Sequence, residues 1–319
     1  MKIEQVEMVS VDSLVAKDHP YRKMKELIDF GKLTKSVNIE EKELGATGYT
    51  IRRLIMCLIL QFKENLSDRL FERYMTENVA GKWFCEFGLT EKTPDYSTFC
   101  KFRNKLGTEE IERIFNSARE QLKVKGYLSE IFTFIDASAL ISKLSMWEER
   151  DKSISDGYYK FNNEVIEKYA KDKDVRIGAK GKNKFWFGFK KNVSVDMQSG
   201  MINKVKVTKA NVTDADGLED VCPDSGAVAA DKGYVGAIDK ILEKGCHPMV
   251  ILKNNMKEKN RDKDRFISGL RAPYEGTFSK QQKRVRYQGT LKNQAAEFLY
   301  AIAFNFRRLL VLDAQAART

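Results

Sequence analysis

The chain has 319 residues, of which 42% are apolar and 11% aromatic. This length exceeds what one hydrophobic core usually organises, so we expect a globular protein of two domains. The longest apolar run, residues 54–60, is far shorter than the roughly 20 residues that a membrane-spanning helix needs. The opening residues lack the continuous apolar stretch of a secretory signal, so the sequence predicts a cytoplasmic protein without a membrane span.

Histidine and cysteine usage restricts the chemistry. The only histidines are His19 and His247, and the five cysteines form no C-x-x-C pair. These counts argue against a zinc site, a disulfide framework and a histidine-based catalytic triad. No glycine-rich loop has the spacing of a phosphate-binding loop, so we expect no nucleotide cofactor. An active site in this chain should therefore be built from carboxylates.

The positive charge is concentrated in two stretches. The net charge is +11, to which residues 168–191 contribute +7 and residues 253–292 contribute +8, so the remainder sums to −4. Basic runs are often solvated loops, but their Lys and Arg side chains can also neutralise the phosphates of a nucleic acid. Two such runs beside a carboxylate site favour the second interpretation.

The N-terminal part of the chain has helical periodicity. Thr50 and Ser67 can each cap a helix whose apolar residues recur at helical spacing. A turn at residues 94–97 then leads into a short helix that Gly107 ends, and a longer amphipathic helix follows over residues 111–122. Three basic side chains are predicted to face outward from the short helix: Lys101, Arg103 and Lys105. This pattern is compatible with a helix-turn-helix DNA reader, although any helical bundle would give it.

From about residue 131 the pattern changes to that of strands. Residues 131–135 form a β-rich run that ends at Asp136, and residues 227–230 form a short apolar run that ends at Asp231. The other predicted elements are a hairpin, a helix, a strand and a closing helix, over residues 186–207, 237–244, 249–252 and 298–309. This order indicates a mixed sheet with at least one parallel crossover.

Asp136 and Asp231 are the candidate catalytic carboxylates. Both stand where predicted strands end, and the carboxyl ends of strands are where α/β sheets place ligand sites. Each could instead simply cap the turn that follows it. If the two strands are neighbours, the two carboxylates converge, and this arrangement requires a shared cation or proton. Oxygen ligands favour Mg²⁺ or Mn²⁺, and two such ions can clamp the attacking and leaving oxygens of a phosphoryl transfer.

A third carboxylate would complete the site. Spacing alone does not choose among three downstream candidates: Glu258, Glu275 and Glu297. Glu275 lies near the predicted start of a helix that follows Pro273, whereas Glu297 lies inside the closing helix, where we expect it on the surface. Basic side chains that could hold substrate phosphates follow Glu275: Lys280, Lys283, Arg284 and Arg286.

The segments around these carboxylates resemble the three catalytic blocks of bacterial insertion-sequence transposases of the DDE class, in the insertion-sequence-four and -five group. They read Phe-Ile-Asp-Ala-Ser at 134–138, Ala-Asp-Lys-Gly-Tyr at 230–234 and Arg-Ala-Pro-Tyr-Glu-Gly-Thr-Phe at 271–278. Residues 94–103, 186–190, 208–214 and 303–308 are also similar to blocks of this group, so the likeness covers about residues 50 to 310. The third block departs from the group, because Ser268 and Gln282 stand where it has Tyr and Lys; Lys283 or Lys280 could replace that Lys.

The resemblance implies an α+β protein, with a helical DNA-binding domain over residues 1–128 and a ribonuclease-H-like mixed-sheet catalytic domain over residues 129–319. It implies that Asp136, Asp231 and Glu275 hold two Mg²⁺ or Mn²⁺ ions for strand cleavage and for the subsequent transfer of a 3′-hydroxyl end to target DNA. Arg271 and the downstream basic residues would contact phosphates, and Lys232 and Tyr234 would support the carboxylates.

The implied partner is double-stranded DNA, as terminal inverted repeats and as target, in a nucleoid-associated bacterial setting. Because two element ends must be paired, a homodimer is the natural expectation. Two alternatives stay open at this point. One is a hydrolytic DNA nuclease that uses the same site without strand joining. The other is a DNA-binding protein derived from a transposase that is no longer catalytic.

Overall fold

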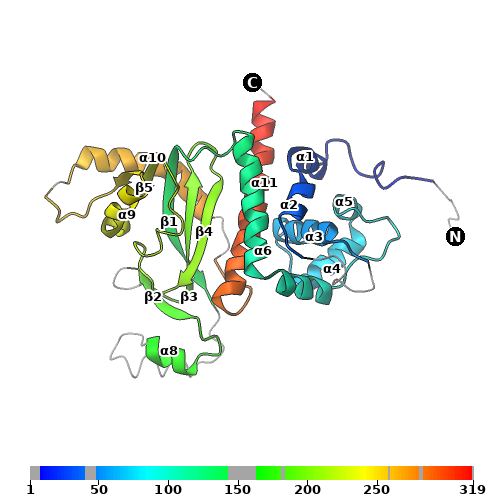
Figure 1. Cartoon of the computed structure of the whole chain (residues 1–319), viewed down its shortest axis with the longest axis horizontal. Helices are drawn as coiled ribbons and strands as arrows, with labels where there is room; N and C mark the ends of the chain where they lie inside the picture. The colour runs from blue at the N-terminus through cyan, green and yellow to red at the C-terminus, as the bar shows by residue number, and fades with distance from the viewer. Residues whose placement is uncertain are drawn as a thin grey trace. The chain divides into compact units, whose positions relative to one another are not determined.

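A computed structural model describes residues 8–39, 48–142, 163–180, 184–257, 259–279 and 283–317. The chain divides into two compact units, one formed by Met1–Gln121 with Ile302–Thr319 and the other by Leu122–Ala301. The first unit is helical and the second contains the sheet (Figure 1). None of the described helices combines the length and the apolar character that crossing a membrane would require.

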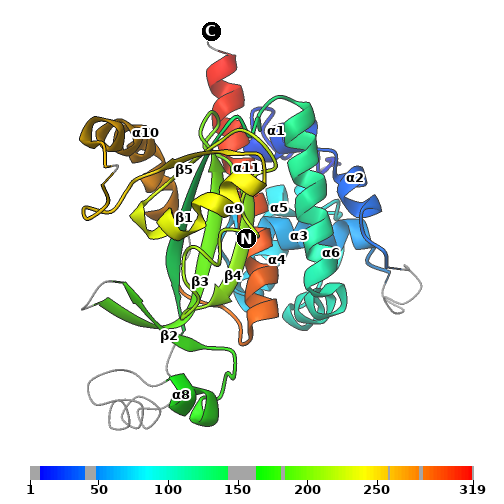
Figure 2. The same cartoon turned by 60° about the vertical axis from the view of Figure 1, so that its left-hand side comes forward.

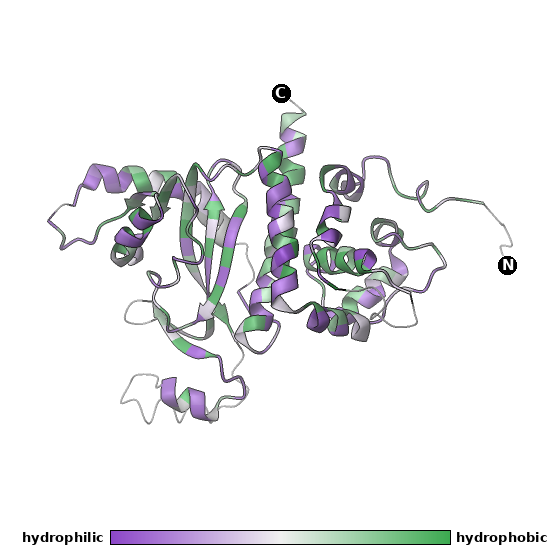
Figure 3. Cartoon of the chain, viewed as in Figure 1, coloured by the Kyte–Doolittle hydropathy of each residue, from purple (hydrophilic) through white to green (hydrophobic). Residues whose placement is uncertain are grey.

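The first unit is built from short helices around a buried central one. Its helices are α1 (Pro20–Leu27), α2 (Phe30–Lys35), α3 (Ile51–Lys63), α4 (Asp68–Glu77), α5 (Val79–Phe84) and most of α6 (Tyr96–Val124). Every residue from Leu54 to Phe62 is buried, so α3 is the core helix (Figure 3). The predicted caps are confirmed, because the side chains of Thr50 and Ser67 accept hydrogen bonds from the third residue of their helices. Gly107 interrupts α6 with a φ of 68°, as the sequence predicted.

Arg103 contradicts the prediction that it faces outward. Its guanidinium group forms two hydrogen bonds with the carboxylate of Asp68 at the start of α4, at 2.8 and 2.6 Å. The Arg103 side chain is only 9% exposed. The periodicity located the apolar face of this helix but not the second helix that covers its flank. Lys101 and Lys105 are exposed, as predicted.

The second unit is a mixed sheet with ribonuclease-H-like topology. Its strands are β1 (Phe132–Ile141), β2 (Arg176–Lys180), β3 (Lys184–Asp196), β4 (Ile202–Lys209), β5 (Ala227–Ala230) and β6 (His247–Val250). The order is β2-β3-β1-β5-β6, and β4 also pairs with β3. β3 runs antiparallel to β1, β2 and β4, whereas β1, β5 and β6 are mutually parallel, so the predicted mixed sheet and α+β fold are confirmed.

Helices cover both faces of this sheet. They are α8 (Asn163–Tyr169), the 3-10 helix η2 (Lys232–Ala237), α9 (Ile238–Glu243), α10 (Arg261–Ser279) and α11 (Thr290–Ala316). Figure 2 shows α9 and α10 beside the strands. Ile241 of α9 packs with Ile135 on one face, whereas Arg271 of α10 lies over Phe134 on the other. Successive residues of a strand point to opposite faces, so Asp136 shares the face of Phe134.

Two predicted boundaries are wrong. β1 does not end before Asp136 but continues to Ile141, because it stays paired with β3 beyond the carboxylate. The helix that carries Glu275 begins at Arg261, so Pro273 lies inside it and Glu275 lies in its C-terminal half. Proline normally favours a helix start, but here the residues before it are held against the sheet, since Ile267 is fully buried.

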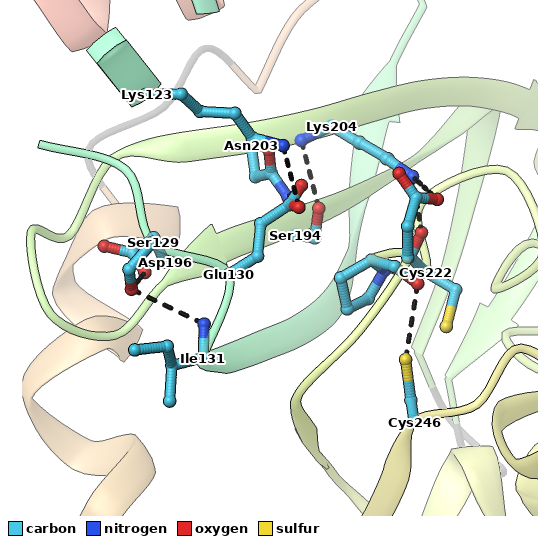
Figure 4. Close-up of polar contacts among 12 residues, drawn as sticks. Lys123, Ser129, Glu130, Ile131, Ser194, Asp196, Asn203, Lys204, Cys222 and Cys246 are labelled. Carbon is cyan, nitrogen blue, oxygen red and sulfur yellow. Dashed lines mark hydrogen bonds and ion pairs between the residues drawn. The ribbon is translucent and has the colours of Figure 1, made fainter. Parts of the chain in front are cut away.

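The start of β1 is fixed by a group of buried polar contacts (Figure 4). Glu130 adopts a φ of 60° and accepts hydrogen bonds from Lys123 of α6 at 2.8 Å and from Asn203 of β4 at 2.6 Å. Ser129 donates to Asp196 at the end of β3 at 2.9 Å. These contacts tie the chain that leaves α6 to two neighbouring strands before β1 begins.

Glu297 contradicts the prediction that it lies on the surface. It forms an ion pair with Lys191 of β3, in which Oε2 of Glu297 lies 3.0 Å from Nζ of Lys191. The Glu297 side chain is only 5% exposed and the Lys191 side chain only 2%. α11 lies against the strands at this point, because Gln294 also bonds to the backbone of β4. Burial raises the pKa of the Glu297 carboxyl group, and the charge of Lys191 opposes this shift.

We expect Glu297→Leu to lower the free energy of unfolding by about 3–5 kcal/mol, because it removes the carboxylate that balances the charge of the buried Lys191 ammonium group. The double variant Lys191→Met/Glu297→Leu should recover most of that loss, since it buries no charge. Urea unfolding of the two variants and the unmodified chain measures both changes. A single variant as stable as the unmodified chain would contradict the buried pair.

Candidate active site

Asp136 and Asp231 stand on neighbouring parallel strands. The last residues of β1 and β5 that pair with each other are Phe134 and Ala229, and the two aspartates both lie two residues further along. The two aspartates therefore occupy matching positions on neighbouring strands, with Asp136 inside β1 and Asp231 directly after the end of β5. Asp231 also caps η2, because its Oδ1 accepts the backbone N–H of Gly233 at 2.8 Å. The turn-capping role considered from the sequence is thus real for Asp231, and it coexists with the convergence of the two carboxylates.

The hydroxyl group of Tyr234 is buried within reach of these charges. The Tyr234 side chain is fully buried, and its hydroxyl has no hydrogen-bond partner among the described residues. Burial raises the pKa of Tyr234, and the negative charges of Asp214, Asp136 and Asp231 raise it further. Buried polar groups without partners are rare in folded proteins and often mark functional sites.

Asp214, in the connection between β4 and β5, is a third carboxylate near Asp231. A Cβ atom built on Gly233 would lie 2.9 Å from Oδ1 of Asp231 and 3.1 Å from Oδ2 of Asp214. The two oxygens are therefore no more than about 6 Å apart. We did not select Asp214 as a site residue from the sequence, although it ends the Thr-Lys-Ala-Asn-Val-Thr-Asp segment in which the resemblance was noted.

A pocket of about 780 Å³ opens beside Asp136. Its lining includes Asp136, Trp186, Lys190, Asp214 and Lys283. Lys190 of β3 donates to Oδ1 of Asp214 at 2.7 Å and to the carbonyl oxygen of Val212 at 2.6 Å. The pocket therefore has both negative and positive side chains in its wall, from segments far apart in the sequence.

The helix α10 brings Arg271 to the face of β1 that carries Asp136. The Arg271 guanidinium carbon lies 4.8 Å from the ring centroid of Phe134, and its buried Nε has no partner among the described residues. Beyond α10, the carbonyl oxygen of Lys283 accepts the backbone N–H of Ile141 at 2.7 Å. Glu275, one helical turn after Arg271, lies between these two attachments.

Several predicted residues lie outside the described part of the chain, wholly or in their side chains. The side chain of Glu275 is among them, as are Glu258, Lys280 and Gln282. Of the other predicted basic residues, Lys283 and Arg284 are exposed, and Arg286 lies 5.2 Å from the ring centroid of Tyr300. Lys232 is exposed directly after Asp231.

The donors at this site suit a hard divalent cation. Adjacent carboxylates repel each other unless a cation or proton is shared, and carboxylate oxygens are typical ligands of Mg²⁺ and Mn²⁺. Asp136 and Asp231 supply such oxygens from neighbouring strands. Within the described ranges, no three His, Cys, Asp or Glu residues converge closely enough to form a complete metal site. A complete site would thus need a ligand from outside the described side chains.

Two family models match the chain. A transposase domain known as DUF772 matches residues 9–105, and a transposase DDE domain matches residues 158–306. These matches indicate a DNA transposase. The DDE range of the transposase includes Asp214, Asp231 and Glu275, whereas Asp136 precedes it. No curated protein and no solved structure matches the chain.

The family matches also bear on the partner and the cofactor of this transposase. Transposase domains imply that the chain binds DNA, and DDE transposases generally use divalent metal ions. The cofactor class therefore agrees with the oxygen donors of Asp136 and Asp231, which stand on adjacent strands.

We expect Tyr234→Phe to leave the free energy of unfolding unchanged or to raise it by up to about 1 kcal/mol, because a buried hydroxyl without a partner costs desolvation and gains no hydrogen bond. Thermal unfolding of the metal-free protein measures the change. A clear loss of stability would mean that the hydroxyl group is already satisfied in the folded chain.

Proposed function

We propose that this transposase cleaves DNA at the ends of an insertion sequence and joins the resulting 3′-hydroxyl ends to target DNA, as a member of the insertion-sequence-four and -five group. The observation that carries this proposal is the side-by-side position of Asp136 and Asp231 on β1 and β5. The match to a transposase DDE domain over residues 158–306, which include Asp231, supports the proposal.

Asp136, Asp231 and Glu275 are proposed to hold two Mg²⁺ or Mn²⁺ ions. Ions bound there would polarise the scissile phosphate and lower the pKa of the attacking water. Bound cations would also offset the repulsion between these carboxylates and the scissile phosphate, whereas basic side chains elsewhere on the surface would hold the DNA backbone without metal.

Glu275 is preferred to Glu297 as the third carboxylate. Glu297 is already paired with Lys191 in the interior, 3.0 Å from its ammonium group. Glu275 instead follows Arg271 by one turn on the helix that lies over the Asp136 face of β1. Glu258 lies outside the described residues, so no position in the fold supports it.

Basic residues around the carboxylates are proposed to bind the DNA backbone. Those that belong to the proposed catalytic domain in the sequence are Arg271, Lys280, Lys283, Arg284 and Arg286, and Lys101 and Lys105 lie in the helical unit. Arg103 is left out of this set, because its guanidinium group is taken by Asp68. Lys232 and Tyr234 are proposed to support Asp231 through the turn that it caps.

The organisation of the transposase follows from these roles. We propose a helical DNA-binding domain over residues 1–128 and a catalytic domain over residues 129–319, although the last residues of α11 group with the helical unit. Because both ends of an element must be cut and joined together, we propose that the transposase acts as a homodimer on terminal inverted repeats.

Asp136→Asn and Asp231→Asn should each reduce Mg²⁺-dependent nicking of DNA by at least about 100-fold, because each removes a charge that holds the metal. Binding of DNA in EDTA should be retained. Mg²⁺ should raise the melting temperature of the unmodified chain and not that of either variant. Asp224→Asn, which changes an exposed carboxylate elsewhere in the same unit, is the control. Undiminished nicking by either site variant would refute the assignment.

Glu275→Gln should abolish nicking at an unchanged melting temperature, if this residue is the third ligand. Glu297→Gln should instead lower the melting temperature, because it disrupts the buried pair with Lys191. Nicking assays and thermal unfolding of both variants separate the two roles. Full nicking activity of Glu275→Gln would exclude Glu275 as a ligand and leave the carboxylate pair on β1 and β5 in place.

The reaction itself is tested by supplying DNA with a free 3′-hydroxyl end, Mg²⁺ and a circular target. Joined product supports the proposed transposase. Cleavage without joining would identify a hydrolytic nuclease. A folded chain that binds DNA and does neither would be a non-catalytic DNA-binding protein, which is the alternative that Ser268 and Gln282 of the third block favour.

A further inference from the structure

We infer that Lys190, held in place by Asp214, contacts a backbone phosphate of the DNA in the pocket beside Asp136. This inference rests on the proposed function, because it requires DNA to enter that pocket. It adds a substrate contact and a positioning residue that the three-carboxylate site does not contain.

Lys190 is oriented by two strong hydrogen bonds. Its ammonium group donates to the Val212 carbonyl oxygen at 2.6 Å and to Oδ1 of Asp214 at 2.7 Å, and its side chain is only 9% exposed. An ammonium group has three N–H donors. Among the described residues, the third donor of Lys190 has no acceptor that we can identify, and the group lines the pocket. That donor is therefore available to a ligand in the pocket.

Asp214 links this lysine to the carboxylate pair. One oxygen of Asp214 accepts from Lys190, and the other lies within about 6 Å of Oδ1 of Asp231. The position of the ammonium group is therefore fixed relative to Asp231 before DNA binds. A charge that is already oriented loses little conformational freedom on binding, which favours a precise contact over a loose one.

The charges of the pocket favour a phosphate as the ligand. Asp136 and Asp214 would repel a phosphate group, whereas Lys190 and Lys283 would attract it. Both lysines line the pocket, but Lys283 is exposed to solvent, whereas the Lys190 side chain is nearly buried. Lys190 is thus the cation that would meet a phosphate already withdrawn from solvent, where a charged hydrogen bond is strongest.

The same sheet offers a matched control away from the pocket. Lys204 of β4 donates to the Cys222 carbonyl oxygen at 2.8 Å and to Oδ1 of Asp224 at 2.9 Å (Figure 4). The arrangement repeats that of Lys190, because each lysine donates to one carbonyl group and to a carboxylate two residues later, both in the connection between β4 and β5. Lys204 is not among the described residues that line the pocket beside Asp136. Lys204 therefore tests the same set of contacts outside the pocket.

The test is the salt dependence of DNA affinity, measured in EDTA with a short fluorescein-labelled duplex of mixed sequence. Each lysine that neutralises a phosphate contributes about one unit to the slope of log K against log salt concentration. Lys190→Met should lower the slope by about one unit, and Lys204→Met should leave it unchanged. Lys190→Arg should keep the slope, because it keeps a cation. Asp214→Asn should also keep the slope, because the cation of Lys190 remains.

An unchanged slope in a folded Lys190→Met variant would overturn the inference. If that variant is unstable, Lys190→Met/Asp214→Asn removes both charges, and the same slope then decides. Because this measurement needs no cleavage, it is independent of the proposed reaction. A lower slope in Lys190→Met together with undiminished nicking by Asp136→Asn would support the Lys190 contact and refute the proposed catalytic site. An unchanged slope in Lys190→Met together with loss of nicking in Asp136→Asn would refute the Lys190 contact and support the catalytic site.

Discussion

The parallel pairing of β1 with β5 is the constraint on which the candidate site depends. It places Asp136 and Asp231 two residues beyond the last paired residues of the two strands. Two negative charges therefore lie at matching positions on neighbouring strands. Hydrogen bonding along the strands and burial of their apolar side chains hold the carboxylates there despite their mutual repulsion. The Tyr234 hydroxyl group and Nε of Arg271 are buried nearby without hydrogen-bond partners in the described chain, so hydrogen-bonding capacity remains unused around the two carboxylates.

Adjacent lysines on β3 show how strand geometry divides one basic segment between two tasks. Lys190 and Lys191 point to opposite faces of the sheet, as successive strand residues do. Lys191 is buried beneath α11, and its charge is paired with that of Glu297 inside the protein. Lys190 is held by Asp214 at the wall of a pocket. A count of basic residues along the chain cannot distinguish these two positions.

The connection between β4 and β5 is attached to the sheet by the same kind of contact at two points. In each case a strand lysine donates to a backbone carbonyl group and to a carboxylate two residues further on, through Asp214 near the start of the connection and Asp224 near its end. Such clamps satisfy buried donors and fix loop positions without an apolar core of their own. The difference between the two is their location, because only the first adjoins the carboxylate pair among the residues described.

The sequence alone determined most of the elements and named the two aspartates of the candidate site. Helix caps at Thr50 and Ser67, the break at Gly107 and the strand before Asp231 depend on local backbone and periodicity preferences, which a short window of sequence contains. The tertiary structure decided which charges are neutralised. Arg103 and Asp68 are 35 residues apart, and Lys191 and Glu297 are 106 apart. Burial of such pairs arises from the packing of distant segments, so periodicity placed Arg103 and Glu297 outward and overlooked Asp214.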